Sequence, residues 1–416
     1  MRNVLRQFNV KNAVSIMAVL VVTIAGLSAC AQNQTTNSQA PVTIGVSLSF
    51  SGDFKDDGQA MKQGYQLWAD TVNNNGGLLG RLVKLVILDD KSDPDQVAKN
   101  YATLIHTDHV NLVLGPFSSL LTKAAAPVVQ SAGYAFIEGA GGAPSVFRNG
   151  WKNLFAVSLP VEKNLTTFAY FILSLPDQIR PKTAAYATSD DPFTFPQLDY
   201  VRHLLEQGGI KTVYNPQPYD STKITGDAVR PYAEQVVQSH ADVVLLGTLL
   251  PEAATYIKVF QKDNYTPKAI IATAGPDLGQ DFINSVGGVK NTEGVFVPNG
   301  WYPQANNFQN AQMVQDYLAQ YGGTADQINA DVAEAFSVGQ VLQEVVNMKH
   351  SIDNSVLIKA LHSDLVFNTV QGTTKFDDTG QNTTALPYLF QWQHGQFLTV
   401  YPSFVAAENP EYPVHP

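Results

Sequence analysis

Short apolar runs alternate with amphipathic segments from residue 42 onward. The run at 42–49 predicts a strand, because strands of a sheet covered on both faces are almost continuously apolar. Residues 59–74 predict a helix, with Met61 and Tyr65 four residues apart on one face. The stretch rich in Asn and Gly at 73–77 indicates the end of this helix, because both residue types tolerate a left-handed turn.

The same alternation continues to residue 272. Further strands are predicted at 82–88, 111–114, 134–138, 183–187, 210–214, 242–247 and 268–272. Helices are predicted from Pro94 and at 119–132, 162–175, 195–207, 227–239 and 252–264. Strands that alternate with helices at this spacing predict parallel sheets with helices on both faces. Because the pattern runs through two consecutive sets, we expect an α/β protein with two doubly wound parallel-sheet lobes.

The C-terminal third has a different pattern. Helices are predicted at 310–321, 331–349 and 355–363. Strands at 389–392 and 396–401 flank His394 and Gly395, which is typical of an antiparallel hairpin. We therefore expect the chain to return to both lobes before a proline-rich tail at 406–416.

The N-terminal segment has the features of an export signal. Positive residues precede an uncharged apolar run at 13–27, which is short for a membrane span. The sequence Leu-Ser-Ala-Cys at 27–30 resembles a bacterial lipobox, and Cys30 is the one cysteine of the chain. We expect residues 1–29 to be a lipoprotein signal peptide and Cys30 to be lipidated and to anchor the protein to a membrane. Residues 30–41 would form a flexible polar tether.

The charge of the chain excludes one class of partner. The formal net charge is −10, and removal of the signal peptide would make it more negative. An acidic surface repels phosphate backbones and anionic lipid, so we expect no nucleic-acid partner.

Enzyme signatures are missing from the sequence. We find no G-x-S-x-G, H-E-x-x-H or G-x-x-x-x-G-K-[ST] motif, and the glycines at 139–142 do not complete a dinucleotide fingerprint. His106 and His109 could share a metal, but solvent-facing histidines explain them better. The acid pairs at 89–90 and 190–191 are interpreted as turn and cap residues. We therefore expect no catalytic residues, no cofactor and no metal.

Two loops are candidates for ligand binding. In open parallel sheets, ligands lie beyond the carboxyl ends of the strands. Ser118 and Ser119 follow one predicted strand and open a helix, where hydroxyl and backbone N–H groups suit an anionic or carbonyl oxygen. The glycine-rich loop at 139–142 follows the next strand and lets a ligand approach the main chain. Ordinary turn chemistry is the alternative for both loops.

Several short motifs together carry a family resemblance. They are Val-Thr-Ile-Gly-Val at 42–46, Asn-Gly-Gly-Leu-Leu-Gly-Arg at 75–81, Asp-Pro at 93–94, Leu-Gly-Pro at 114–116, Pro-Glu-Ala at 251–253 and Val-Gln-Gly at 370–372. In this order and spacing the chain resembles the branched-chain amino-acid-binding family of periplasmic proteins, also called the leucine/isoleucine/valine-binding or type I family. The resemblance covers about residues 42–404.

The resemblance implies a periplasmic binding protein of type I, with two lobes joined by a three-strand hinge that close on a ligand like a Venus flytrap. It implies crossings near 156–160, 295–299 and 369–373. The first lobe would be 42–157 plus 298–370, and the second 158–297 plus 371–405. A permease of an ABC importer would then recognise the closed form, and ATPase subunits would act through that permease.

The resemblance also implies a ligand site. Ser119 matches the family's serine for an α-carboxylate, and Ala140 and Gly141 match its backbone-contact loop. Gly142 replaces the family's threonine there. Phe193 and Leu249 (or its neighbour Leu250) fall where the family has tyrosines. Asp277 lies near the acid that pairs with an α-ammonium, and Asp57 near the tyrosine of the first loop.

These departures change the expected ligand. An ammonium that loses its carboxylate forfeits about 1.5–3 kcal/mol and also carries a desolvation cost. We therefore expect a small amino-acid-like, carboxylate, amide or aromatic-like solute rather than a standard branched-chain amino acid. Asp277 or Asp57 would supply an amine site. The predicted function is an extracytoplasmic solute-binding protein of an ABC importer; a ligand sensor module of a signalling system is the alternative, and an exported hydrolase is less favoured.

Overall fold

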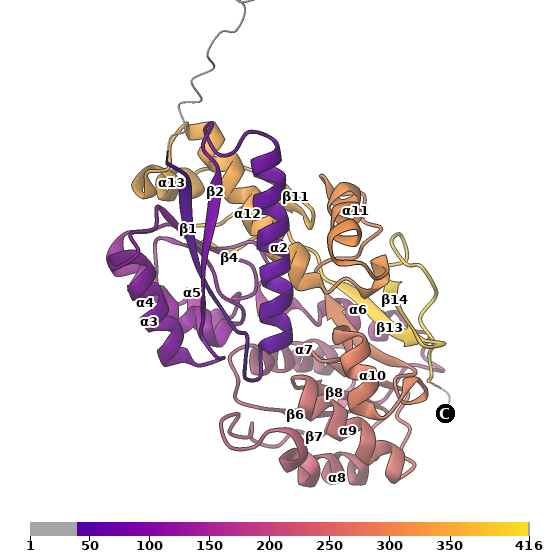
Figure 1. Cartoon of the computed structure of the whole chain (residues 1–416). Helices are drawn as coiled ribbons and strands as arrows, with labels where there is room; N and C mark the ends of the chain where they lie inside the picture. Colours follow the sequence, from indigo (N-terminus) through magenta and orange to yellow (C-terminus); the bar gives the residue numbers. More distant parts are fainter. Residues whose placement is uncertain (1–39, 415–416) are drawn as a thin grey trace, which may run out of the picture. The chain divides into compact units, whose positions relative to one another are not determined.

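The computed structural model describes residues 40–414, which contain two large β-sheets and one two-stranded sheet (Figure 1). The predicted signal peptide, Cys30 and the tether up to residue 39 lie outside the described residues. The two large sheets confirm the expected α/β class.

The first sheet is parallel and has the strand order β2-β1-β3-β4-β5. Its strands are β1 (Val42–Leu48), β2 (Val83–Asp89), β3 (Leu112–Leu114), β4 (Phe136–Glu138) and β5 (Leu154–Ala156). One face packs against α2 (Lys55–Asn74), α11 (Asn310–Tyr321), α12 (Ala330–Lys349) and α13 (Asn354–Leu361). The other face packs against α3 (Pro94–His106), α4 (Ser119–Ala132) and the short α5 (Pro144–Phe147). Burial on both faces explains why most residues of these strands are apolar.

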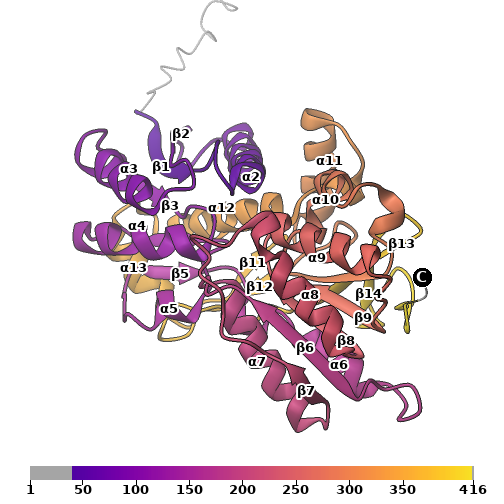
Figure 2. The same ribbon diagram turned by 90° about the horizontal axis from the view of Figure 1, so that it is seen from below.

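The second sheet has the strand order β14-β13-β10-β9-β8-β6-β7. The parallel strands are β6 (Thr183–Thr188), β7 (Lys211–Tyr214), β8 (Val243–Gly247), β9 (Ala269–Ala272) and β10 (Val295–Asn299). Helices α6 (Thr166–Ser174) and α7 (Thr194–Gln207) cover one face. The other face carries α8 (Arg230–Ser239), α9 (Leu250–Lys262) and α10 (Gln280–Val286), as can be followed in Figure 2.

The predicted hairpin is present at the edge of this sheet. Strands β13 (Tyr388–Gln393) and β14 (Gln396–Tyr401) pair antiparallel, and β13 also pairs antiparallel with β10. The turn residues His394 and Gly395 have φ values of 52° and 74°. A two-residue hairpin turn with two positive φ angles matches the right-handed twist of the strands.

Helix ends follow the expected chemistry in the first lobe. The carboxylate of Asp93 accepts hydrogen bonds from the backbone N–H groups of Asp95 and Gln96, so it caps α3 ahead of Pro94. Gly133 ends α4 with a left-handed φ of 73°.

Several predicted boundaries differ from the structure. Helix α2 begins at Lys55, before the predicted start at residue 59. Its first turn lacks the apolar spacing of a helix because it faces a cavity rather than the core. The helix predicted at 162–175 begins at Thr166 after a 3₁₀ turn at Val161–Lys163. Helices α5 and α10 were not predicted, since both are too short to show a helical period.

The chain stays with the first sheet for longer than the resemblance implied. Strands β11 (Phe367–Thr369) and β12 (Gly372–Thr374) pair with each other, and Phe376 then packs on Phe155 with ring centroids 5.3 Å apart. The side-chain amide of Asn382 donates to the carbonyl of Val157 at 2.6 Å. We therefore place the third crossing between Asn382 and Tyr388, in place of the expected 369–373.

The C-terminal segment packs on the second sheet. The side-chain amide of Gln391 donates to the carbonyl of Glu411 at 3.0 Å, and the backbone N–H of Val414 donates to the carbonyl of Lys268 at 2.9 Å. The tail expected at 406–416 is thus held by contact over its described residues.

Helices α2 and α12 run side by side at unusually close range (Figure 1). A Cβ atom at Gly339 of α12 would lie 2.2 Å from the Trp68 ring of α2. A Cβ atom at Gly64 of α2 would lie 2.2 Å from the carbonyl oxygen of Val332. Both glycines are therefore required for this contact, which brings the first turns of the two helices together.

Replacing Gly339 with alanine tests this contact. Alanine gains about 1 kcal/mol of helix propensity over glycine, but the added methyl group collides with Trp68. Because Trp68 is fully buried, we expect overpacking to dominate and the free energy of unfolding to fall by about 1–3 kcal/mol. Urea unfolding measures the change. The control Asn347→Ala on the exposed face of α12 should leave stability equal or slightly higher; a more stable Gly339→Ala protein would contradict the close contact.

Candidate ligand-binding site

The carboxyl ends of strands from both large sheets line one cavity with a volume of about 730 Å³. The first sheet contributes loops that follow β1, β3 and β4, and the second contributes loops that follow β6, β8 and β9. This is where ligands bind in parallel sheets, and the volume suits a small molecule.

Most of the ligand-binding residues expected from the sequence line this cavity. They are Asp57, Ser118, Ser119, Ala140, Phe193, Leu249 and Asp277. Gly141 and Gly142 are not among its lining residues. Cβ atoms at these two glycines would lie 2.4 Å from the Thr122 hydroxyl and 2.9 Å from the carbonyl oxygen of Leu159, so both face the protein itself.

The two serines at the start of α4 have different roles. Ser118 is the N-cap, and its hydroxyl accepts a hydrogen bond from the backbone N–H of Leu121 at 3.2 Å. Ser119 is fully buried, and its hydroxyl has no hydrogen-bond partner within residues 40–414. Because buried polar groups are almost always paired, the Ser119 hydroxyl is available for a polar atom of a ligand.

The glycine-rich loop is occupied by the protein's own carboxyl group. Glu138 is fully buried at the end of β4, and its side chain accepts hydrogen bonds from the backbone N–H groups of Ala140 and Gly141. Burial raises the pKa of Glu138 to about 8. These two N–H groups belong to the loop that the resemblance assigns to backbone contacts with the ligand, and they are already used by Glu138.

A cluster of four carboxyl groups lines the cavity. Asp57 comes from the first turn of α2, Asp331 and Glu334 from the first turns of α12, and Asp277 from the 3₁₀ turn at Pro276–Leu278 after β9. We call these four residues the acidic cluster. The carboxyl groups of Asp57 and Asp331 are close enough for a hydrogen bond between them to lower the pKa of Asp57 and raise that of Asp331.

Burial raises the pKa of every member of the acidic cluster. The pKa of Asp57 rises to about 7, mainly through burial and further through the charge of Asp277. The pKa of Asp277 rises to about 6 through burial, although the Gly275 N–H group donates to its carboxylate. The pKa values of Asp331 and Glu334 rise well above the ordinary range through burial and the neighbouring negative charges. Within the described part of the chain, no lysine, arginine or histidine forms an ion pair with any of the four.

Two further acids at the cavity have structural partners. Asp191 accepts hydrogen bonds from the backbone N–H groups of Phe193 and Thr194, at 2.7 and 3.2 Å. Glu252 accepts from the N–H groups of Gly226 and Leu249, at 2.7 and 3.3 Å. These carboxylates hold the loops of the second sheet, as the sequence analysis expected for the acid at residue 191.

Aromatic and aliphatic side chains form the rest of the wall. Phe54 and Phe117 meet edge to face, with ring centroids 5.5 Å apart. Phe193 and Leu249 follow strands of the second sheet but pack against the hydrophobic cluster beneath α3 and α4. These two side chains thus connect the loops of one lobe with the core of the other.

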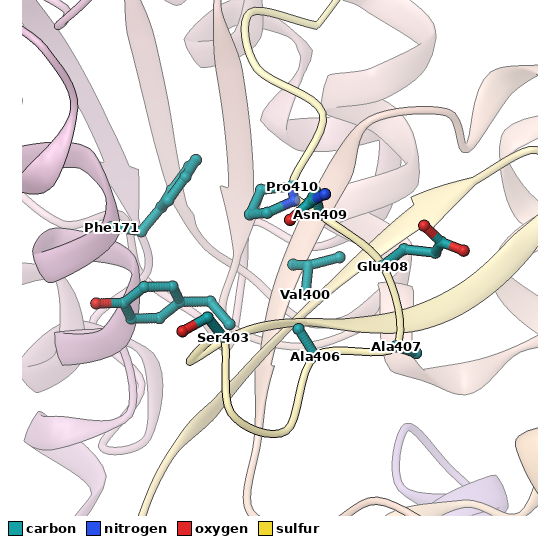
Figure 3. A pocket seen from close by; sticks show the side chains of 9 residues that line it. Phe171, Val400, Ser403, Ala406, Ala407, Glu408, Asn409 and Pro410 are labelled. Carbon is teal, nitrogen blue, oxygen red and sulfur yellow. The ribbon is translucent and has the colours of Figure 1, made fainter.

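A second, smaller cavity lies at the end of β14, away from the carboxyl ends of the parallel strands (Figure 3). Its volume is about 340 Å³, and its lining comes from Phe171, the end of β14 and the segment that follows it. Figure 3 shows Phe171, Val400 and Pro410 around it, with Glu408 as its one charged side chain. It lies within one lobe and brings no set of polar groups together.

The described residues offer neither a metal site nor a membrane-spanning helix. His106 and His109 are exposed, and residues 40–414 contain no group of His, Cys, Asp and Glu suited to hold a metal ion. None of the helices in the described range is long and apolar enough to cross a membrane.

Sequence reasoning missed Asp331, Glu334 and Glu138. Helix α12 is buried on nearly all sides, yet it carries two acids three residues apart in its first turns. Acids on a face that is otherwise apolar indicate a cavity, because a packed core would not accept them. No comparable pattern marks Glu138, whose role depends on the loop that folds back onto it.

Comparisons with known proteins agree with this geometry. A family model described as periplasmic binding protein matches residues 41–396. Leu/Ile/Val-binding protein homolog 7 of Brucella melitensis is 24% identical over 389 residues, which cover 89% of this chain and 93% of the relative. An amino acid binding protein of Pseudomonas aeruginosa is 25% identical over 289 residues, or 70% of this chain and 73% of the relative.

Solved structures share the fold. The leucine binding protein LivK of Thermotoga maritima superposes with a TM-score of 0.74 at 19% identity, covering 86% of this chain and 97% of that one. The substrate-binding protein LivJ of Streptococcus pneumoniae, in complex with isoleucine, gives a TM-score of 0.73 at 17% identity and the same coverage. These matches confirm the two-lobed architecture and the resemblance inferred from the sequence. The chain belongs to the periplasmic binding protein family, whose members bind ligands outside the cytoplasm and are not enzymes.

Proposed function

We propose that the protein is the solute-binding component of an ABC importer, which captures a small polar solute and presents it to a permease. The observation that carries this proposal is the cavity shared by the strand ends of both sheets. Its unpaired Ser119 hydroxyl and its carboxyl groups leave polar positions for a ligand to fill.

The two-lobed architecture supports a capture mechanism. A solute that contacts loops of both lobes binds the closed arrangement more tightly, so it shifts the protein toward that arrangement by its differential affinity. Phe193 and Leu249 already bridge the lobes, and the solute adds polar contacts beside them. The permease recognises the closed protein, and its ATPase subunits supply the energy.

An N-terminal lipid keeps the protein beside its permease. Cys30 takes the lipid after removal of residues 1–29, and ten residues of polar tether reach roughly 35 Å when extended. This distance clears the lipid headgroups and leaves both lobes free to close.

Native mass spectrometry of the purified protein, followed by uptake of the detected solute in cells with and without the protein, tests this function. We expect a bound small molecule whose uptake falls in cells without the protein. At 100 times its Kd, the solute should stabilise the protein by about 2.7 kcal/mol.

Ser119→Ala should weaken binding about two- to tenfold and leave stability unchanged, because its hydroxyl has no protein partner.

Ser118→Ala is the matched control for this variant. It removes a helix cap and should cost about 1 kcal/mol of stability with a smaller effect on affinity. If the protein stays empty and no solute stabilises it or depends on it for uptake, the importer function is wrong.

Replacement of Cys30 tests the anchor separately. Cys30→Ser removes the thiol that accepts the lipid, so we expect the protein to leave the membrane fraction and to lose the mass of the lipid. Cell fractionation and intact-protein mass spectrometry measure both. An unchanged membrane fraction for Cys30→Ser would show that another segment holds the protein.

A further inference from the structure

We infer that the cavity takes a small aliphatic dication, such as a linear diamine, in which two positively charged nitrogen groups bind carboxyl groups of both lobes. The inference rests on the proposed solute-binding function and names the class of solute. It differs from the acid or amide expected from the sequence alone.

The charge of the cavity wall is one-sided. Eight acids line the cavity. Its lining within the described residues includes no lysine, arginine or histidine. The acids are Asp53, Asp56, Asp57, Asp191, Glu252, Asp277, Asp331 and Glu334. Like charges repel strongly where water is partly excluded, and buried charges are normally paired. Asp191 and Glu252 are paired with backbone N–H groups, whereas no basic side chain is paired with the acidic cluster in the described chain. A cationic ligand would supply that partner.

The acidic cluster is divided between the lobes. Asp57, Asp331 and Glu334 lie on helices of the first lobe, whereas Asp277 lies on a loop of the second. The four are close enough for the charge of Asp277 to raise the pKa of the other three. A ligand with one cationic group at each side would therefore neutralise both lobes and favour their closure.

The loop after β4 offers no free backbone donor to a ligand carboxylate. The backbone N–H groups of Ala140 and Gly141 already bind Glu138. Of the oxygen-binding groups expected there, the Ser119 hydroxyl is left without a partner. A carboxylate would meet the negative wall without those two donors, so a diamine should bind better than the amino acid that differs from it by one carboxylate.

Buried hydroxyl groups support the presence of an organic ligand. Ser119 and Tyr219 both line the cavity, are 0% and 3% exposed, and have hydroxyl groups without a hydrogen-bond partner in the described chain. Each hydroxyl can accept a hydrogen bond from an ammonium group. A bare metal ion does not fit this arrangement, because the cavity of about 730 Å³ is far larger than an ion and residues 40–414 contain no metal-holding cluster.

Isothermal titration with matched ligand pairs tests the charge preference. Cadaverine and lysine differ by one carboxylate, as do agmatine and arginine; leucine, glutamate and Ca²⁺ complete the set. We expect cadaverine or agmatine to bind at least about tenfold more tightly than its amino acid, with no measurable binding of leucine or glutamate. Binding of leucine, glutamate or Ca²⁺ in preference to the diamines would overturn the inference, as would failure of every cation to bind.

The first of these outcomes would leave the importer function intact, because another solute would still be bound. The importer function would fail only if the native protein also proved empty and dispensable for uptake. The two proposals are thus separable.

Variants of the acidic cluster distinguish ligand binding from a structural role. Glu334→Gln or Asp57→Asn should weaken diamine binding at least about tenfold, because an amide cannot become the carboxylate that pairs with an ammonium group, and neither variant should lower the melting temperature of the ligand-free protein. Glu234→Gln, on the exposed surface of α8, is the matched control and should change neither. If both cluster variants lowered the melting temperature and left diamine affinity intact, the cluster would be structural and the inference wrong.

The pH dependence gives a second test. The pKa of Asp57 is about 7 and that of Asp277 about 6, so both lose protons as pH rises from 5.5 to 8. The groups that act on Asp57 are also acids, namely Asp277, Asp56 of α2 and Asp331 of α12, and Asp57 and Asp277 in turn raise the pKa of Glu334. Diamine affinity should therefore rise over this pH range, and binding should release protons. Calorimetric titrations in buffers of different ionisation enthalpy measure the number of protons released.

Stability without ligand should change in the opposite direction. These carboxyl groups have pKa values raised above those of the unfolded chain, so the folded protein holds extra protons between about pH 4 and 7. The melting temperature should fall as pH rises through this window, and saturating diamine should remove the fall. The inference would be contradicted if the affinity for the diamine did not change with pH and the melting temperature of the ligand-free protein rose with pH.

Discussion

The close packing of α2 against α12 is the constraint on which the site depends. Two glycines, Gly64 and Gly339, let the helices approach until ring and backbone atoms are in contact. Because the helices run in the same direction, their first turns meet at the carboxyl end of the first sheet. Asp57 and Asp331 are thereby held close enough for each carboxyl group to shift the pKa of the other. The partial positive charge at both helix starts reduces the repulsion without removing it.

This arrangement stores unfavourable electrostatic energy in the empty protein. The core beneath the helices is large and apolar, and it keeps the carboxyl groups in place although their burial raises every pKa in the cluster. Functional sites are where such shifts collect. A ligand of opposite charge relieves the repulsion, and because Asp277 belongs to the other lobe the same contacts favour closure. Specificity and conformational change thus have one physical origin.

The sequence predicted what depends on local pattern. Apolar runs located the parallel strands, Asp93 located a helix start, and His394 with Gly395 located the hairpin turn. The acidic cluster could not be predicted as a unit, because Asp57 and Asp331 are far apart in the chain and meet only through the packing of two helices. Glu138 was missed for a related reason: its occupation of the loop N–H groups follows from the path of the backbone at residues 138–141.

The third crossing shows the same limit. The motif at 370–372 resembles a crossover, but contacts of Phe376 and Asn382 keep the following residues on the first sheet. Such contacts depend on side chains that lie far away in the sequence, and local propensity carries no information about them.

A crystal structure of the protein with bound cadaverine is the most direct test of this account. It predicts one ligand nitrogen within about 3 Å of carboxylate oxygens of Asp57, Asp331 or Glu334, and the other at the same range from Asp277, with both lobes in contact with the ligand. An empty cavity at saturating cadaverine, or a ligand whose nitrogens avoid these carboxylates, would contradict it.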